Sequence, residues 1–240
     1  LVYRRRNGNE LAAKQIGTAK KVAKLLAKFP YVKGIAVSGS LSKNFATDKS
    51  DIDFFIITAA YRLWIARTCM HLYKKLTFLR GRQNSFCMNY SVAEVAMEIQ
   101  EKNIFTAMEI VTLLPMYGKD SLGEFMKKNK WADSFFPLKD FSNIASPPVN
   151  KGLFSKFIEK IFSGRIGELA DKGLMNITRK RWQKKAQQHQ LNSRGGFMGM
   201  IVGRHFSKPD PKNFQAKVIK AYQEKVEDIL QHNKPAVAFV

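Results

Sequence analysis

The stretch that decides the fold is VSGSLSKNFATDKSDIDFFIIT, from Val37 to Thr58. It begins and ends in apolar, β-branched and aromatic residues, which favour strands, and a polar run joins the two apolar parts. Three aspartates fall within six residues, from Asp48 to Asp53, in a chain whose formal net charge is +22. Acids gathered beside an apolar run in so basic a chain indicate a candidate site.

Two of these aspartates, Asp51 and Asp53, fall at the start of the second predicted strand. Residues two apart on a strand point to the same side, about 6.6 Å apart along the strand. Two carboxylates that face together repel each other unless a cation lies between them, and hard oxygen ligands of this kind suit Mg²⁺ or Mn²⁺. Asp48 is expected in the loop, because a lysine and a serine separate it from the strand.

The first predicted strand ends at Gly39 and Ser40. Glycine lets a ligand approach the backbone closely, and a serine hydroxyl with neighbouring N–H groups can hold a phosphate oxygen. Lys43 follows three residues later, within reach of the same phosphate. A Gly-Ser turn or an Asp-x-Asp strand start is ordinary when it occurs alone, but the combination of the two between apolar strands is far less expected by chance.

Gly39-Ser40 followed by Asp51-Ile52-Asp53 resembles the signature of the DNA polymerase beta-like nucleotidyltransferase superfamily, over roughly residues 10–100. The resemblance implies an α/β (α+β) fold, a mixed β-sheet flanked by helices. It also implies that Asp51 and Asp53 are catalytic and bind divalent metal that carries a nucleoside triphosphate such as ATP. An acceptor would then attack the α-phosphate, with the phosphates bound by Gly39, Ser40 and Lys43.

The superfamily commonly adds a third carboxylate from a later strand. In this chain the corresponding strand is predicted at SFCMNYSV, and the residue at the expected position is Asn89. An amide oxygen is a weak metal ligand and cannot act as a base. Glu98, on a further strand predicted at EVAMEI, is either a substitute ligand or a solvent-facing residue. The alternative function is therefore a catalytically weakened protein that keeps this fold and binds nucleic acid or nucleotide.

The apolar spacing predicts helices over 10–28 and 60–79 in the first half of the chain. Strand signals fade after Lys102, where five further helices are predicted. We therefore expect a catalytic domain at 1–102 and an all-helical C-terminal region at 103–240, with a candidate linker at 137–152. These five helices are predicted in NIFTAMEIVTLL, in SLGEFMKKNKWADSFF with a capping box of Ser121 and Glu124, at 153–162, from 166 onward, and in NFQAKVIKAYQEKVEDIL.

Two further segments are open to more than one interpretation. RGGFMGMIVG, at 194–203, lacks the strand and helix that a dinucleotide-binding loop needs, and we expect an irregular connection or the start of a helix. TRKRWQKKAQQ is a candidate nucleic-acid contact, because basic residues neutralise phosphates and a Trp face can stack on a base. It could equally be a solvated helix face with one core Trp. The contact residues would be Arg179, Lys180, Arg181, Trp182, Lys184 and Lys185.

The overall composition favours polyanionic partners, since 41 Lys and Arg stand against 19 acids. Nucleic acid, nucleotides and an anionic membrane face all meet this description. No apolar run reaches the ~18 residues that cross a bilayer, and Cys69 and Cys87 are expected as free thiols of a reducing compartment. We therefore expect a cytoplasmic protein; the acceptor and the oligomeric state stay open.

Overall fold

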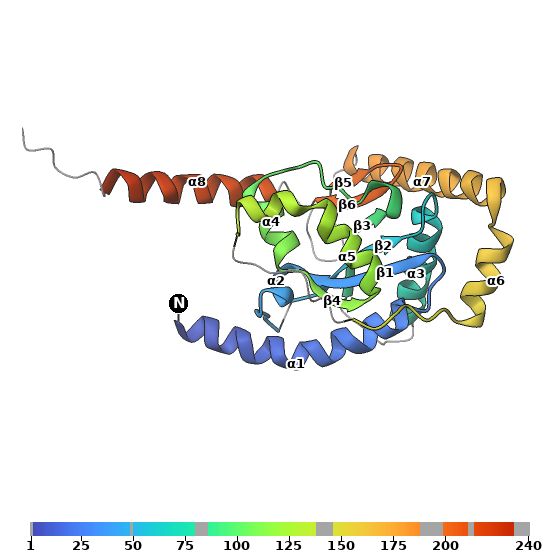
Figure 1. Cartoon of the computed structure of the whole chain (residues 1–240), viewed down its shortest axis with the longest axis horizontal. Helices are drawn as coiled ribbons and strands as arrows, with labels where there is room; N and C mark the ends of the chain where they lie inside the picture. The colour runs from blue at the N-terminus through green and yellow to red at the C-terminus, as the bar shows by residue number, and fades with distance from the viewer. Residues whose placement is uncertain are drawn as a thin grey trace, which may run out of the picture.

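The computed structural model describes residues 2–48, 50–79, 86–137, 146–187, 199–210 and 214–232. Within these residues the centre of the molecule is a six-stranded sheet in the order β4-β1-β2-β3-β6-β5 (Figure 1). The strands are β1 (Val32–Ser38), β2 (Ile52–Thr58), β3 (Phe86–Ala93), β4 (Leu114–Tyr117), β5 (Gly199–Val202) and β6 (Phe206–Asp210).

The sheet is mixed. β2 and β3 run parallel, joined by a crossover through helix α3 (Leu63–Leu79), and the other neighbouring pairs run antiparallel. A parallel pair needs such a crossover, and the long apolar helix after the aspartate strand provides it. The predicted fold class, a mixed sheet flanked by helices and followed by a helical C-terminal region, is confirmed.

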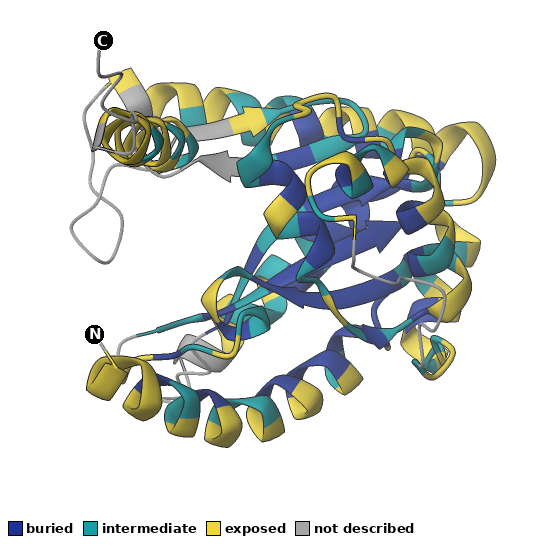
Figure 2. Cartoon of the chain, turned by 60° about the vertical axis from the view of Figure 1, so that its left-hand side comes forward, coloured by how far each residue is buried: buried dark blue, intermediate teal, exposed yellow. Residues whose placement is uncertain are grey.

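The two faces of the sheet pack against different helices. Phe54 and Ile56 belong to a core that α1 (Val2–Leu26) and α3 complete, whereas Phe55 and Ile57 belong to a second core with α4 (Ile104–Val111) and α5 (Lys119–Lys128). Both faces of β2 are therefore buried, as its unbroken apolar run requires. Figure 2 shows the buried strands lying between the helices, whereas α8 (Phe214–His232) is exposed along almost all of its described residues.

The C-terminal helices are α6 (Leu153–Ile161), α7 (Gly164–Gln187) and α8 (Phe214–His232). α7 packs on α3, where the buried carboxylate of Asp171 accepts hydrogen bonds from the backbone N–H groups of Trp64 (2.7 Å) and Ile65 (3.0 Å). These N–H groups lie in the first turn of α3 and have no partner within their own helix. α7 thus caps a helix that lies about a hundred residues earlier in the chain.

Several local predictions are wrong. EVAMEI forms no strand: residues Glu94–Ala96 are a short 3₁₀ turn, after which Met97 and Ile99 enter the second core. The capping box is also absent, because α5 starts at Lys119 after Gly118, whose φ of 85° suits glycine, and Ser121 lies inside the helix. Gly199–Val202, predicted as an irregular connection or helix start, is a strand that pairs with β6.

The C-terminal region thus adds short strands β4, β5 and β6 to the sheet that its helices flank. Each has only four or five residues, too few to show alternation in the sequence. Of the predicted linker 137–152, residues 138–145 lie outside the described residues, as do Arg194 to Met198. None of the helices in the described ranges is long and apolar enough to cross a membrane.

Candidate functional site

The Gly-Ser turn and the aspartate strand lie side by side. Ser38, the last residue of β1, pairs with Asp53 of β2 across the antiparallel ladder. Gly39 follows with φ +68°, and a Cβ on it would lie 2.5 Å from Asp53 Oδ2. Only glycine allows this approach. Ser38 Oγ is buried and has no hydrogen-bond partner among the described residues.

The other predicted residues of this turn lie close by. Asp51 directly precedes β2, and both it and Asp53 are half-buried, whereas Asp48 is exposed in the loop as expected. Ser40 is exposed on the short helix α2 (Gly39–Ser42). The structure therefore brings Gly39, Ser40 and the two aspartates to one edge of the sheet.

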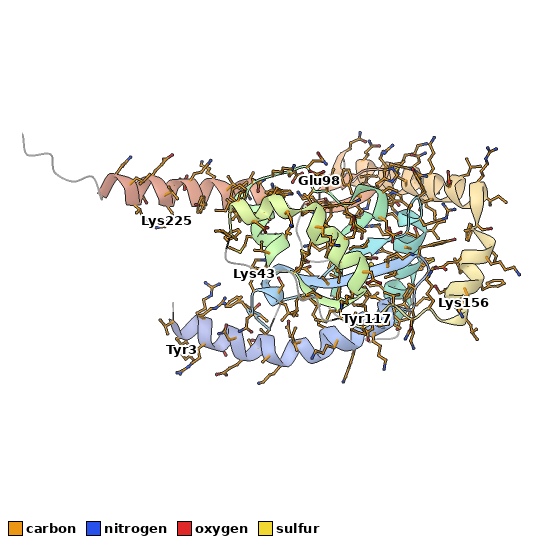
Figure 3. The ribbon with its side chains drawn as sticks, viewed as in Figure 1. Tyr3, Lys43, Glu98, Tyr117, Lys156 and Lys225 are labelled. Atoms are coloured by element: carbon orange, nitrogen blue, oxygen red, sulfur yellow. The ribbon has the colours of Figure 1, made fainter. Side chains whose placement is uncertain are left out.

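Lys43 turns back onto this site. Its Nζ donates to the carbonyl oxygen of Gly39 at 3.0 Å and lies 2.8 Å from Glu109 Oε1. Glu109 belongs to α4, and Figure 3 shows Lys43 between α4 and α1. The sequence offers no signal for Glu109, because only the packing of α4 against the sheet brings it there.

The loop after the Gly-Ser turn rests on α1. Arg5 donates to the carbonyl oxygen of Lys43 at 2.8 Å, and Ala46 N–H donates to the carbonyl oxygen of Gly8 at 3.0 Å. The ring of Phe45 lies under Arg5, 5.8 Å from the guanidinium carbon to the ring centre. A basic helix thus holds the loop that leads to the aspartates and puts positive charge beside it.

The residues of β3 beside the start of β2 include no acid. β3 places Cys87, not Asn89, opposite Asp53; Met88 and Tyr90 pair with successive residues of β2, so Asn89 forms a bulge between them. Burial raises the pKa of the Cys87 thiol, and the nearby Asp53 and Asp51 raise it further, against the lowering effect of Lys74 and Arg67. The thiol is therefore protonated at neutral pH and is no anionic ligand in this state.

Glu98 lies in a different part of the molecule. β3 runs parallel to β2, and its end at Ala93 pairs with Thr58, the end of β2 remote from Asp53. Glu98 follows beyond that end, is exposed, and forms an ion pair of 2.7 Å with Lys102. Figure 3 shows Glu98 and Lys43 well apart. The strand on which Glu98 was predicted does not form.

The donor set available to a cation is therefore two carboxylates. Within the part of the chain that the structure describes, no group of three or more His, Cys, Asp or Glu side chains could hold a metal. Mg²⁺ in nucleotide enzymes is commonly bound by only one or two carboxylates together with substrate phosphates and water. Asp51 and Asp53 fit that kind of site, in which the substrate completes the coordination.

The predicted nucleic-acid contact lies on α7. Lys180, Arg181 and Lys184 are exposed and Trp182 is half-buried, while Lys185 is part of the same helix. Arg179 donates within α7, to Asn176 Oδ1 at 3.4 Å and to Met175 Sδ at 3.7 Å. Lys180, Arg181 and Lys184 thus form a basic face of α7, on a different element from the aspartates, whereas the half-buried Arg179 and Trp182 lie on the other side of the helix.

Comparison with known families agrees with this geometry. Residues 19–114 match the family model described as a nucleotidyltransferase domain, and this range contains Gly39, both aspartates, β3 and Glu109. No curated protein and no solved structure matches the chain. The resemblance to the DNA polymerase beta-like superfamily is thus confirmed over residues 19–114, which match a nucleotidyltransferase domain.

Proposed function

We propose that this protein transfers a nucleoside monophosphate from a nucleoside triphosphate to an acceptor. The observation that carries the proposal is the contact of Gly39 with Asp53, where a Cβ would come within 2.5 Å of the carboxylate. Because Gly39 has no side chain, the turn packs directly against the Asp53 carboxylate, so a phosphate held by the turn and a cation held by the carboxylates would lie next to each other.

In this proposal each residue of the turn binds one part of the triphosphate. Asp51 and Asp53 hold Mg²⁺ or Mn²⁺, which when bound neutralises the phosphates and stabilises charge on the attacking and leaving oxygens. Ser40 is exposed on α2, where its hydroxyl can donate to a phosphate oxygen. Lys43 supplies positive charge to the phosphates. To do so, its ammonium group either breaks its ion pair with Glu109 or contacts Glu109 and a phosphate at the same time.

The reaction itself is a displacement at the α-phosphorus. A nucleophilic atom of the acceptor forms the new bond to phosphorus while the bond to the bridging oxygen breaks, and pyrophosphate leaves with that electron pair. The proton of the acceptor passes to solvent or to a carboxylate of the site. The protein mainly positions charge, which suits a site built from one turn and one strand end.

The surrounding chain fits an anionic substrate. The helical region after residue 102 would supply acceptor specificity, and nucleic acid is one acceptor that suits a formal charge of +22. Cys69 and Cys87 are both free thiols, which agrees with a cytoplasmic location.

The experiment is incubation with α-labelled nucleoside triphosphates, Mg²⁺ or Mn²⁺, and separate RNA, small-molecule and protein acceptors. We expect label to move to one acceptor class and to be lost by more than about a hundredfold in Asp51→Asn or Asp53→Asn. Asp48→Asn is the matched control, because Asp48 is an exposed acid of the same loop, and it should keep activity. Transfer that survives both strand substitutions contradicts the proposal.

A second candidate is a protein that binds nucleic acid or nucleotide without transfer. It is favoured by one observation: the residue opposite Asp53 on β3 is Cys87, with Asn89 in the adjoining bulge, where the superfamily commonly has an acid. RNA binding that weakens steeply with salt, without metal-dependent turnover on any acceptor, would support this candidate.

A further inference from the structure

Helix α6 is fixed to the protein by one side only. Ser155 is fully buried, and Ile158 and Phe162 pack against the first core. Glu159 also points inward: its Oε1 accepts the backbone N–H of Tyr31 at 2.7 Å and its Oε2 pairs with Lys151 at 2.7 Å. The acid of α6 is therefore used to hold the helix in place.

The end of α6 is held as firmly. The hydroxyl of Tyr31 donates to the carbonyl oxygen of Phe162 at 2.9 Å, and Arg62 donates to the carbonyl oxygens of Phe162 (3.2 Å) and Gly164 (2.8 Å). These contacts fix the corner between α6 and α7 to the residues that directly precede β1 and α3. The outer side of α6 is thus presented in a fixed orientation.

That outer side is apolar and uncovered. Leu153 is 85% exposed, Phe154 62%, Phe157 63% and Ile161 47%. Their spacing of one, three and four residues places all four on one stripe of the helix. We call these four residues the α6 stripe. Two exposed phenylalanines within one turn are unusual for a surface that faces only water.

Basic side chains accompany the stripe. Residues 151–165 contain four basic side chains, Lys151, Lys156, Lys160 and Arg165, and one acid, the inward-facing Glu159. Lys156 and Lys160 are exposed and lie beside the stripe on the helix wheel. Apolar rings flanked by lysines, with the acid turned away, form the pattern of a helix that lies in the interface of an anionic membrane.

We propose that α6 docks this protein onto an anionic lipid surface, with Phe154 and Phe157 inserted among the acyl chains and Lys156 and Lys160 at the headgroups. α6 forms an outer end of the molecule, so a flat surface can reach it (Figure 1). Lys156 lies well away from Lys43, so docking leaves the aspartate site clear (Figure 3). The charge of the flank favours a lipid surface over a purely apolar partner face.

The test uses the full chain with vesicles of phosphatidylcholine alone and with added phosphatidylglycerol. We expect binding to the anionic vesicles, weakened at least about tenfold by the double variant Phe154→Ser/Phe157→Ser. The matched control is Tyr222→Ser/Leu230→Ser, which removes two exposed apolar side chains from α8. Thermal unfolding is measured for both double variants, and each should unfold in a cooperative transition as the wild-type protein does.

A second readout separates insertion from attraction to the basic surface as a whole. Phe157→Trp should emit at shorter wavelength on anionic vesicles and be quenched by brominated acyl chains, whereas Tyr222→Trp should not, each compared with the wild-type protein. Vesicle binding that is unchanged in Phe154→Ser/Phe157→Ser, or no binding at all, overturns the proposal. Self-association that the same variant abolishes also overturns it, because a second copy then covers the α6 stripe. Asp51→Asn should bind vesicles normally, so this result does not depend on the proposed reaction.

Discussion

Lys43 and Glu109 form an ion pair across the candidate site, with 2.8 Å between Nζ and Oε1, although 66 residues separate them in the chain. Both side chains are about one-third exposed or less. A triphosphate that uses Lys43 must compete with this carboxylate. If Lys43 binds phosphate as proposed, Glu109 competes with the triphosphate for this lysine.

We predict that Glu109→Gln lowers the KM for the triphosphate by up to about fivefold, the range of a partly exposed ion pair. Lys43→Met should raise it, and the double variant should behave as Lys43→Met alone, because Glu109 acts through the lysine. Steady-state kinetics of the four proteins checks this. A Glu109→Gln variant as impaired as Lys43→Met would show instead that the acid holds the lysine in its working position.

Gly39→Ala should damage the site and the fold together. The left-handed backbone at φ +68° costs a non-glycine residue about 1–2 kcal/mol, and the new methyl group displaces the Asp53 carboxylate. We expect that loss in the free energy of unfolding, measured in urea, and loss of triphosphate binding by calorimetry.

Gly17→Ala is the matched control for this substitution. Gly17 lies inside α1, and a Cβ added there would meet no other atom within 4 Å, so alanine should raise the stability by about 0.5–1 kcal/mol. Triphosphate binding should be unchanged. A Gly39→Ala protein that binds triphosphate normally would contradict the proposed phosphate site.

Asp171 should be the most costly single acid to remove from the C-terminal helices. Asp171→Ala leaves the N–H groups of Trp64 and Ile65 without their acceptor and leaves Arg204, whose Nη1 lies 3.0 Å from Asp171 Oδ2, without its carboxylate. We expect a loss of about 2–4 kcal/mol in urea unfolding. The exposed Asp120→Ala should lose at most about 1 kcal/mol, and equal losses would refute the capping role.

His71 should make the free energy of unfolding decrease when the pH falls below about 6.5. Burial first, and then Arg67, Lys74 and Lys75, lower the pKa of this imidazole to about 3. The imidazole of the unfolded chain has a pKa near 6.5. The stability that the neutral, buried His71 contributes is therefore fully present above that pH and is lost as the pH falls from 6.5 toward 3.

The free energy of unfolding should fall by at most about 1.4 kcal/mol per pH unit, because His71 takes up one proton on unfolding. His71→Leu removes that proton and also the buried Nε2, which has no hydrogen-bond partner among the described residues. Urea unfolding between pH 6.5 and 5 compares the two proteins. Parallel stability curves would show that His71 accepts a proton in the folded state.

The basic face of α7 predicts a salt-dependent effect. If it contacts single-stranded RNA, Arg181→Gln/Lys184→Gln should weaken binding for all sequences and reduce the salt slope by about 0.7 per lost contact. Lys217→Gln/Lys225→Gln on α8 is the control of equal charge (Figure 3 labels Lys225). Equal losses in both variants would indicate attraction to total charge and no specific face.

The parts of the fold that the sequence predicts are those with long or complete local signals. The helices α3, α6 and α8 show apolar periodicity over nine residues or more, and β1 and β2 contain the apolar runs Ile35–Val37 and Phe54–Ile57. β4, β5 and β6 could not be predicted, since their pairing with β1 and β3 depends on contacts between distant segments.

Some residues of the candidate site are likewise predictable from the sequence, and others are not. Gly39 and Asp53 are predictable because an antiparallel pair brings the end of one strand beside the start of the next. The residue opposite Asp53 is not, because the bulge at Asn89 shifts the register by one and only the ladder shows that Cys87 lies there. Glu109 depends on the packing of a helix from outside the motif.

The pairing of β1 with β4 and of β3 with β6 determines how the protein can be shortened in the laboratory. A chain that stops at Lys102 would expose the backbone edges of two hydrophobic strands, and such edges recruit other chains into aggregates. A chain extended through Asp210 keeps each central strand paired on both sides. Soluble production of the nucleotidyltransferase domain should therefore need more than a hundred residues beyond the sequence motif that identifies it.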